Sequence, residues 1–280
     1  MLIFQKNNDN DLCLVLNFTW GDLMTALITG ASGGLGEEFA RLLAKDKYDL
    51  ILVARRKEKL LSLKDELEKS FAVKVFVYDK DLSAPNATRE VFDFVKTQNL
   101  FVELLVNNAG FGDWGFFSDC NIEKQIEMIN LNILALTTLT RLFLPEMIKN
   151  NVGKILNVAS IASFMPGAKM SVYYATKAFV RSFSEALSVE LKKTKSSVTV
   201  TALCPGPVST DFWNRAEAGF SKIFSRMIFA GSKNVALYGY KKMKKGKLLA
   251  LSGFSVRVVA FLTKILPRSF IRNAVYWVQK

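Results

Sequence analysis

Short apolar runs and longer amphipathic stretches alternate along most of the chain. Six runs of β-branched and aliphatic residues are predicted to be buried strands. They lie at 26–29, 48–54, 73–79, 102–108, 153–160 and 197–205. Between them, helices are predicted near 35–46, 57–69, 85–98, 122–150 and 173–194. The leucines of "KEKLLSLKDELEKS" (57–70) show the helical spacing most clearly.

This alternation predicts the class of fold. Repeated strand–helix units form a parallel sheet with helices on both faces. We expect a single α/β domain over 24–280, built on a doubly wound parallel sheet, because no repeat or linker interrupts the pattern. Ligands of such sheets bind beyond the carboxyl ends of the strands, so the residues that follow each strand are the candidates for chemistry.

Residues 1–23 fall outside the alternation. Met24 directly precedes the first strand, and the codons of Trp20, Gly21 and Asp22 are necessarily rich in guanine, as a bacterial ribosome-binding site would be. Our hypothesis is that Met24 is the true start and that 1–23 are an N-terminal extension from a mis-assigned start. A flexible arm or an extra strand is the alternative. Asp9 and Asp11 stand where a secretion signal would carry basic residues, which disfavours secretion.

The composition narrows the chemistry. The 280 residues include no histidine, so a catalytic acid or base must be Tyr, Lys, Asp, Glu or Cys. Cys13, Cys120 and Cys204 are far apart and form no CxxC pair. We therefore expect no disulfide framework, no metal site and a reducing, cytoplasmic location. No uninterrupted apolar run reaches the about 18 residues of a membrane-spanning helix.

The formal net charge of +13 would suit nucleic acid, an anionic membrane or a phosphorylated ligand. The cluster "YKKMKKGK" (240–247) is interpreted as a solvated lysine face, and no nucleic-acid partner is expected. The tail at 254–280 is basic and apolar and could lie on a membrane surface. Packing against the domain or a second subunit is favoured, because amphipathic helices of globular domains normally bury their apolar face.

A glycine-rich bend follows the first strand. In "TGASGGLG" (29–36), Gly30, Gly34 and Gly36 precede the first predicted helix. Glycines allow a tight turn and close backbone approach, and the free amides at a helix start attract a diphosphate. A glycine cluster alone is weak evidence, and its place after the first strand strengthens it.

The next two strands end in charged residues. An NAD site would place Asp or Glu about 20 residues past the glycines, whereas "LVARRKEKL" has Arg55 and Arg56 there. Arginine favours the 2′-phosphate of NADP, with Arg55 preferred, unless both only begin a surface helix. In "YDKDLS", Asp81 could accept from the adenine amine and Leu82 pack beside it, with Asp79 as the competing choice.

The fourth and fifth predicted strands are each followed by candidate residues of the site. "NNAG" (107–110) is a small-residue bend where a cofactor could approach, although Asn107 could instead tie neighbouring strands together by bonds from its side chain to the backbone. Ser160 ends the fifth strand, Tyr173 follows thirteen residues later, and Lys177 lies four residues beyond. Positions i and i+4 share a helix face, so Lys177 is expected to lie beneath Tyr173.

This spacing favours acid–base catalysis. A phenol has a pKa of about 10, and an adjacent ammonium can lower it by roughly 1–3 units. Tyr173 would then exchange a proton with a substrate oxygen that Ser160 holds. Tyr174 and Ser163 are each displaced from that arrangement, by helix register and from the strand end.

Six motifs in order resemble the single-domain short-chain dehydrogenases/reductases. They are "TGASGGLG", "DL" at 81, "NNAG", Ser160, "YYATK" and "PGPVST" (205–210), and the resemblance covers Met24 to about Thr210. It implies a Rossmann fold and an NAD(P)-dependent oxidoreductase that interconverts a carbonyl and an alcohol. It assigns catalysis to Ser160, Tyr173 and Lys177. It also implies a helical Asn in a proton relay, for which Asn132 fits the spacing to Pro145 better than Asn130 does.

The resemblance also implies where the cofactor and substrate lie. The implied NADP contacts are Gly30, Ser32, Gly34, Leu35, Gly36, Arg55, Asp81, Leu82, Asn108, Ala109, Gly110, Tyr173, Lys177, Pro205, Gly206, Val208 and Thr210. Residues 211–245 would be a substrate lid, whose aromatic character indicates an apolar substrate, or else an ordinary core helix.

The protein is expected to be an oligomer, and two other functions are possible. A homodimer or homotetramer through the two long helices is implied by the resemblance. The first rival is a membrane-surface enzyme that reduces lipid-derived or steroid-like ketones. The second is a catalytically silent NADP-sensing protein, which is disfavoured because both Tyr173 and Lys177 are present.

Overall fold

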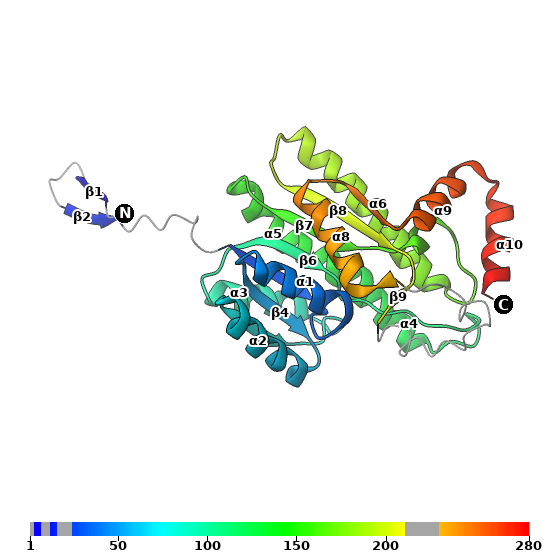
Figure 1. The fold of residues 1–280 in the computed structure, drawn as a ribbon, viewed down its shortest axis with the longest axis horizontal. Coiled ribbons are helices and arrows are strands. Elements are labelled where there is room, and N and C mark those ends of the chain that lie inside the picture. The colour runs from blue at the N-terminus through cyan, green and yellow to red at the C-terminus, as the bar shows by residue number, and fades with distance from the viewer. Residues whose placement is uncertain (1–2, 7–11, 16–23, 211–229, 280) are drawn as a thin grey trace.

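A seven-stranded parallel sheet forms the centre of the computed structural model, which describes residues 3–6, 12–15, 24–210 and 230–279 (Figure 1). The strand order is β11-β8-β7-β6-β3-β4-β5. The strands are β3 (Thr25–Thr29), β4 (Asp49–Ala54), β5 (Val75–Asp79), β6 (Val102–Asn107), β7 (Lys154–Val158), β8 (Thr199–Pro205) and β11 (Leu249–Ser252). The predicted doubly wound α/β fold is confirmed. The reversal of strand order at β3 places the ligand crevice beside that strand.

Helices cover both faces of the sheet (Figure 1). One face carries α1 (Gly34–Lys45), α2 (Lys57–Phe71) and α8 (Ser232–Lys244), and the other carries α3 (Ala87–Thr97), α5 (Leu136–Lys149) and α6 (Ser171–Lys193). All six residues of β4 are buried. A strand covered on both sides needs a continuous apolar run rather than an alternating one, which is the pattern the sequence has.

One long helix joins β6 to β7. It consists of α4 (Ile122–Ile129), the π-helical turn η1 (Asn130–Ala135) and α5, which together span 28 residues and include an 18-residue stretch with a mean hydropathy of 1.3. By length and composition it could cross a membrane. It packs instead against the domain, because α5 contacts β6 and α3, and η1 contacts α6. We therefore assign it to the core of the fold.

The seventh strand was not predicted. β11 has only four residues, follows the lysine cluster and lies at the sheet edge, where it pairs with β8 alone. Helix α8 precedes it and packs against α1, and the hydroxyl of Tyr240 donates a hydrogen bond to Asp46. Lys241 and Lys245 are exposed, as expected of a solvated lysine face.

The remaining elements lie outside the main sheet. Strands β1 (Ile3–Lys6) and β2 (Leu12–Val15) pair with each other, and β9 (Val208–Ser209) pairs with β10 (Ala230–Gly231). The 3₁₀ turn η2 (Ile161–Phe164) follows β7, and α9 (Phe254–Ile265) and α10 (Arg268–Val278) follow β11. The hypothesis about Met24 stays a prediction. Of the expected lid, residues 211–229 lie outside the described residues, and 232–244 are α8, on the sheet.

Candidate active site

The carboxyl ends of the strands face one cavity of about 620 Å³. It reaches from the glycine bend, past Ser160, to α9 and α10. Of the residues predicted for the site, those that line the cavity are Gly30, Ser32, Gly34, Leu35, Arg55, Asp81, Leu82, Asn108, Ala109, Gly110, Ser160, Tyr173, Lys177, Pro205, Gly206, Val208 and Thr210. Gly36 and Asn132 lie behind this wall. Residues that follow separate strands therefore line one common cavity, as the sequence predicted.

The three glycines of the bend could not be replaced by residues with a side chain without a shift of their neighbours. Gly30 and Gly34 have φ of +66° and +58°, values that L side chains rarely adopt. A Cβ on Gly30 would lie 2.8 Å from Nδ2 of Asn108, and one on Gly34 would lie 2.9 Å from Cγ2 of Thr210. A Cβ on Gly36 would collide with the backbone oxygen of Gly30. Since α1 begins at Gly34 with no side-chain cap, its first amides are suited to a diphosphate.

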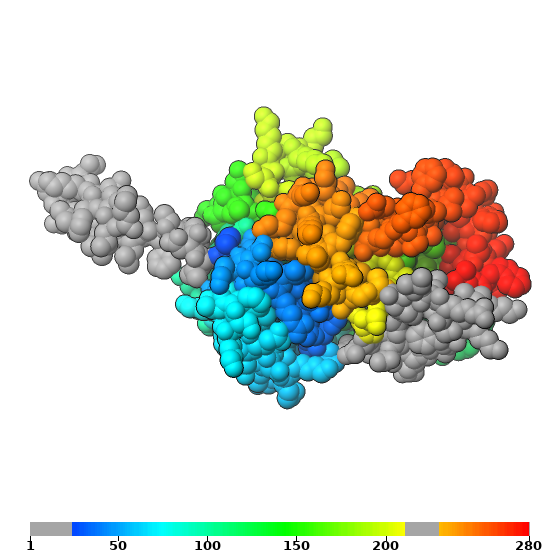
Figure 2. All heavy atoms as spheres, in the orientation of Figure 1, coloured from blue at the N-terminus to red at the C-terminus, as the bar shows by residue number. Residues whose placement is uncertain are grey.

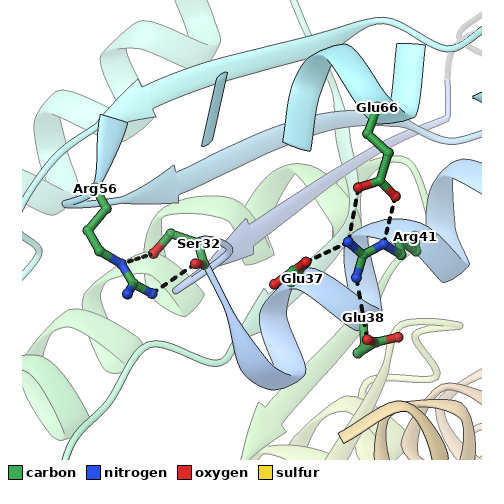
Figure 3. A network of polar contacts seen from close by, with 6 residues as sticks. All are labelled: Ser32, Glu37, Glu38, Arg41, Arg56 and Glu66. Atoms are coloured by element: carbon green, nitrogen blue, oxygen red, sulfur yellow. Dashed lines mark hydrogen bonds and ion pairs between the residues drawn. The ribbon is translucent and has the colours of Figure 1, made fainter. Parts of the chain in front are cut away.

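Both arginines after β4 line the cavity. Arg56 lies over the glycine bend, where its Nε donates to Oγ of Ser32 at 3.2 Å and its Nη2 to the Ser32 carbonyl at 2.8 Å (Figure 3). Arg55 Nη1 pairs with carboxylate oxygens of Asp81 and Glu127, each at 3.2 Å. From the sequence both arginines are candidates for a 2′-phosphate, with Arg55 preferred. The geometry favours Arg56 instead, because Arg55 is already paired with two carboxylates.

Asp81 rather than Asp79 faces the cavity. Asp81 accepts hydrogen bonds from the Ser83 amide at 2.9 Å and the Ser83 hydroxyl at 2.6 Å. Partial burial raises the pKa of Asp81, but these bonds and Arg55 outweigh it and leave the pKa below its ordinary value. Asp79 is outside the cavity, 3.7 Å from Lys57. An ionised Asp81 is able to accept from an amine.

The two asparagines of "NNAG" have different roles. The amide of Asn108 donates to Oγ1 of Thr29 at 2.9 Å, and its Nδ2 donates to the Thr29 carbonyl at 2.9 Å. This fixes the end of β6 beside the glycine bend. Asn107 is buried and does not line the cavity, and its Nδ2 donates to Thr140 and Asn157. Asn107 therefore ties neighbouring elements together, through side chains rather than the expected backbone groups.

Ser160 and Tyr173 meet at the floor of the cavity. Ser160 follows β7, and its Oγ accepts from the amide of Ala162 at 3.1 Å, which fixes the side chain. The hydroxyl of Tyr173 is hydrogen-bonded to Ser160. Burial raises the pKa of Tyr173 to about 12, and the Ser160 bond opposes that rise. A substrate oxygen placed between the two hydroxyls would therefore meet a neutral phenol at pH 7.

Lys177 lies one turn below Tyr173, as the spacing predicted. Its Nζ donates to the carbonyl of Val158 at 2.8 Å and lies 5.8 Å from the centroid of the Tyr173 ring. The expected lowering of the Tyr173 pKa by Lys177 is wrong for this geometry, because burial dominates and raises that pKa. Burial in turn lowers the pKa of Lys177 to about 8.

Asn132 projects from the π-helical turn η1. Its Nδ2 donates to the carbonyl of Phe111 at 2.9 Å and to Oγ1 of Thr176 at 3.1 Å, and its Oδ1 accepts from the Phe111 amide at 3.1 Å. A Cβ on Gly110 would lie 2.8 Å from Oδ1 of Asn132 and 3.5 Å from Nζ of Lys177. The side chain of Asn132 and the ammonium of Lys177 therefore both lie beside Gly110, and the proton relay stays a prediction. π-Turns of this kind are frequent at functional sites.

The competing neighbours point elsewhere. The hydroxyl of Tyr174 accepts from Nε2 of Gln279 at 2.8 Å, and Ser163 contacts Sγ of Cys204 at 3.9 Å. The geometry therefore favours Tyr173 and Ser160.

The outer wall of the cavity is apolar and comes from α9 and α10. Its members include Val256, Val259, Leu262, Leu266 and Val275. The sequence argument missed this wall because helical spacing shows that a face is apolar, and not what that face contacts. Within the described residues, no group of three or more Cys, Asp or Glu could hold a metal ion.

Comparisons with known proteins agree with this geometry. Residues 24–220 match the family model of the short chain dehydrogenases. A very-long-chain 3-oxoacyl-CoA reductase of Homo sapiens is 33% identical over 193 residues, which cover 66% of this chain and 59% of that one. The NADP-dependent 3-hydroxy acid dehydrogenase YdfG of Escherichia coli O157:H7 is 36% identical over 68% of this chain and 75% of its own.

A solved structure extends the likeness beyond sequence. The short-chain dehydrogenase of Sphingobium yanoikuyae in complex with NADPH is 30% identical, with a TM-score of 0.77 over 88% of this chain and 98% of its own. The chain spans only about three fifths of the length of the 3-oxoacyl-CoA reductases. The fold, the motifs and the family match agree, and the chain belongs to the short chain dehydrogenase family.

Proposed function

We propose that the protein is an NADPH-dependent reductase of apolar ketones or aldehydes. The observation that carries this proposal is that Ser160, Tyr173 and Lys177 line the same cavity as the glycine bend and the two arginines after β4. The same cavity thus contains a glycine bend suited to a diphosphate, two arginines for a phosphate group and a tyrosine that can donate a proton. When bound, the nicotinamide cofactor supplies the hydride.

The protein's own groups handle the proton and the substrate oxygen. Ser160 donates a hydrogen bond to the carbonyl oxygen and aligns it with Tyr173. Tyr173 is neutral at pH 7 because burial raises its pKa to about 12, so it gives its proton to the developing alkoxide. Lys177, which lies beneath the Tyr173 ring, and Asn132 would return a proton to the phenolate.

Two features support NADP over NAD. Arg55 and Arg56 stand where an NAD site would place a carboxylate, and Arg56 is held directly over the glycine bend by Ser32. YdfG is named as NADP-dependent, and the Sphingobium yanoikuyae structure contains NADPH. Because the wall from α9 and α10 is built of aliphatic side chains, we infer that the substrate is apolar around its carbonyl.

A cofactor titration followed by a substrate panel tests the proposal. NADPH is expected to raise the melting temperature more than NADH does, and NADPH absorbance is expected to fall with apolar ketones. Equal stabilisation by both cofactors would refute the NADP preference. Stabilisation by NADPH without turnover of any carbonyl in the panel would instead favour a nucleotide-sensing role.

We further propose that the protein forms a homodimer or homotetramer through its two long helices. Ile126, Ile129 and Leu134 are exposed along the α4–η1 segment, and Phe179 and Val189 are exposed on α6. Apolar side chains exposed along two packed helices are typical of subunit interfaces. Light scattering should give a multiple of the 31.4 kDa chain mass, and Leu134→Glu with Val189→Glu should yield a monomer.

A further inference from the structure

Helix α9 has a stripe of exposed apolar side chains. Phe254, Phe261 and Ile265 are 80%, 61% and 61% exposed, and Val258 lies between them on the same face. At about 100° per residue, these four positions fall within about 60° of one another around the helix. They form one continuous strip, which we call the outer stripe. A strip of this size is not expected to face water alone.

The opposite face of α9 belongs to the cavity. Val256, Val259 and Thr263 line it, about half a turn away from the outer stripe. Leu262 and Phe270 line the cavity and are also partly exposed, at 38% and 58%. Part of the exposed rim of the cavity, which we call its mouth, therefore lies between α9 and α10 near the edge of the outer stripe. Figure 2 shows the two helices as a lobe at the end of the molecule away from α2 and α3.

Every charged side chain in the C-terminal part of the sequence, from 218 onward, is basic. Residues 218–280 contain 13 Lys and Arg and no Asp or Glu, so they account for the whole net charge of +13. Arg257 and Lys264 lie beside the stripe on α9, and Arg268 and Arg272 are exposed on α10. An apolar strip with a basic border is the pattern of a helix that lies in the surface of an anionic membrane.

A second copy of the chain fits this face less well. In a symmetric interface the same surface meets itself, so the basic border would face another basic border. No acidic residue in 218–280 is present to pair with it. Anionic phospholipid headgroups supply the missing charge, and the acyl region takes up the aromatic side chains.

We propose that the α9–α10 hairpin docks on an anionic phospholipid surface through the outer stripe, with the cavity mouth turned towards the lipid. An apolar carbonyl dissolved in the membrane then enters between Leu262 and Phe270 and reaches Ser160 and Tyr173 without crossing water. The docking stands on the hairpin alone, and the delivery of substrate rests on the proposed function.

Vesicle flotation tests the docking. The full chain with NADPH is mixed with vesicles of equal parts phosphatidylcholine and phosphatidylglycerol, or of phosphatidylcholine alone. We expect flotation with the anionic vesicles only, and less of it at high salt, because salt screens the headgroup charge. No flotation, or equal flotation with both compositions, would overturn the proposal.

Matched variants locate the contact. Phe261→Ser with Ile265→Ser should lower binding to the anionic vesicles roughly tenfold or more. Phe117→Ser is the control, since Phe117 is 59% exposed but lies outside the hairpin. Arg257→Gln with Lys264→Gln should also lower binding, and Lys192→Gln with Lys193→Gln should not. If the Phe261/Ile265 variant changes the oligomeric state but floats like the wild type, the face is a subunit interface and the proposal fails.

Turnover separates docking from delivery. The Phe261/Ile265 variant should reduce a water-soluble ketone as the wild type does, but lose most of its activity on a long-chain ketone embedded in anionic vesicles. Unchanged activity on both ketones would overturn the delivery step. Flotation by a wild type that reduces neither ketone would leave the docking in place and refute the proposed function.

Discussion

The ammonium of Lys177 lies 5.8 Å from the centroid of the Tyr173 ring, and its hydrogen bond goes to the Val158 carbonyl at 2.8 Å. The lysine therefore sits beneath the phenol without contacting the hydroxyl. Burial raises the pKa of Tyr173 to about 12 and lowers that of Lys177 to about 8. The phenol keeps its proton at neutral pH, which makes it an acid for carbonyl reduction.

Tyr173→Phe tests that role. The variant removes the hydroxyl but keeps the ring, so the melting-temperature rise with NADPH should persist. Turnover of an accepted ketone should fall by roughly 10²–10⁴-fold, the range for loss of a general acid. Tyr174→Phe is the matched control, because the Tyr174 hydroxyl contacts Gln279 rather than Ser160. Similar losses in both variants would contradict the assignment.

The burial of Lys177 should make the free energy of unfolding depend on pH. With its folded-state pKa near 8 and its ordinary value of 10.5, the unfolded chain binds more protons than the folded one between these pH values. Stability should therefore rise with pH across that window. The shift corresponds to up to about 3 kcal/mol. Above pH 10 the raised pKa of Tyr173 acts in the opposite direction, since the folded state then holds the extra proton.

Urea unfolding of wild type and Lys177→Met at pH 7, 8, 9 and 10 measures this effect. The free energy of unfolding of the variant should exceed that of the wild type most at pH 7, and the gap should narrow as the pH rises. A gap that stays constant with pH would show that the ammonium carries no burial penalty.

Much of the fold could be predicted from the sequence, because buried parallel strands appear there as continuous apolar runs. "YDLILVA" predicts β4 within one residue, since a strand covered on both faces must be apolar throughout. β11 could not be predicted in this way, because a four-residue strand at the sheet edge needs few apolar residues and forms no recognisable run. The two terminal helices show an apolar character that does not say which face meets the cavity.

The site was predictable where one motif places one group, as with Ser160 and Tyr173. It was less so where two neighbours satisfy the same spacing. Arg55 and Arg56 both follow β4, and only the fold shows that Arg56 bonds Ser32 while Arg55 pairs with Asp81. The pKa of Tyr173 was mispredicted for a related reason. Helix spacing fixes the side on which Lys177 lies, but burial and the Val158 bond depend on tertiary packing.

Gly36→Ala should weaken cofactor binding. The added Cβ would collide with the backbone oxygen of Gly30, so the bend must shift, at a cost of about 1–3 kcal/mol. The melting-temperature rise with NADPH should shrink markedly. Gly231→Ala is the control, because a Cβ there meets nothing within 4 Å. Equal NADPH responses in the two variants would argue against a cofactor at the bend.

Arg56→Ala should change cofactor preference. Loss of one charge-assisted contact to a 2′-phosphate should lower the affinity for NADPH by roughly tenfold or more and leave NADH nearly unaffected. Arg55→Ala should give a similar but smaller change, since Arg55 already pairs with Asp81 and Glu127. Arg41→Ala is the control, because Arg41 on α1 pairs with Glu37 of the same helix and with Glu66 of α2 (Figure 3). The measurement is the ratio of the two dissociation constants.

Asn132→Ala should reduce both stability and turnover. The side chain is 1% exposed and bonds the amide and the carbonyl of Phe111, so its removal leaves two backbone groups without these partners. The free energy of unfolding should fall by about 2–4 kcal/mol. Thr176→Val removes the third contact of Asn132 together with the bond from the Thr176 hydroxyl to the Tyr173 carbonyl at 2.7 Å, and should cost about 1–2 kcal/mol. If Asn132 also serves the proton relay beside Lys177, its variant should lose turnover in excess of Thr176→Val at temperatures where both are folded. Equal turnover in the two folded variants would limit Asn132 to holding Phe111 in place.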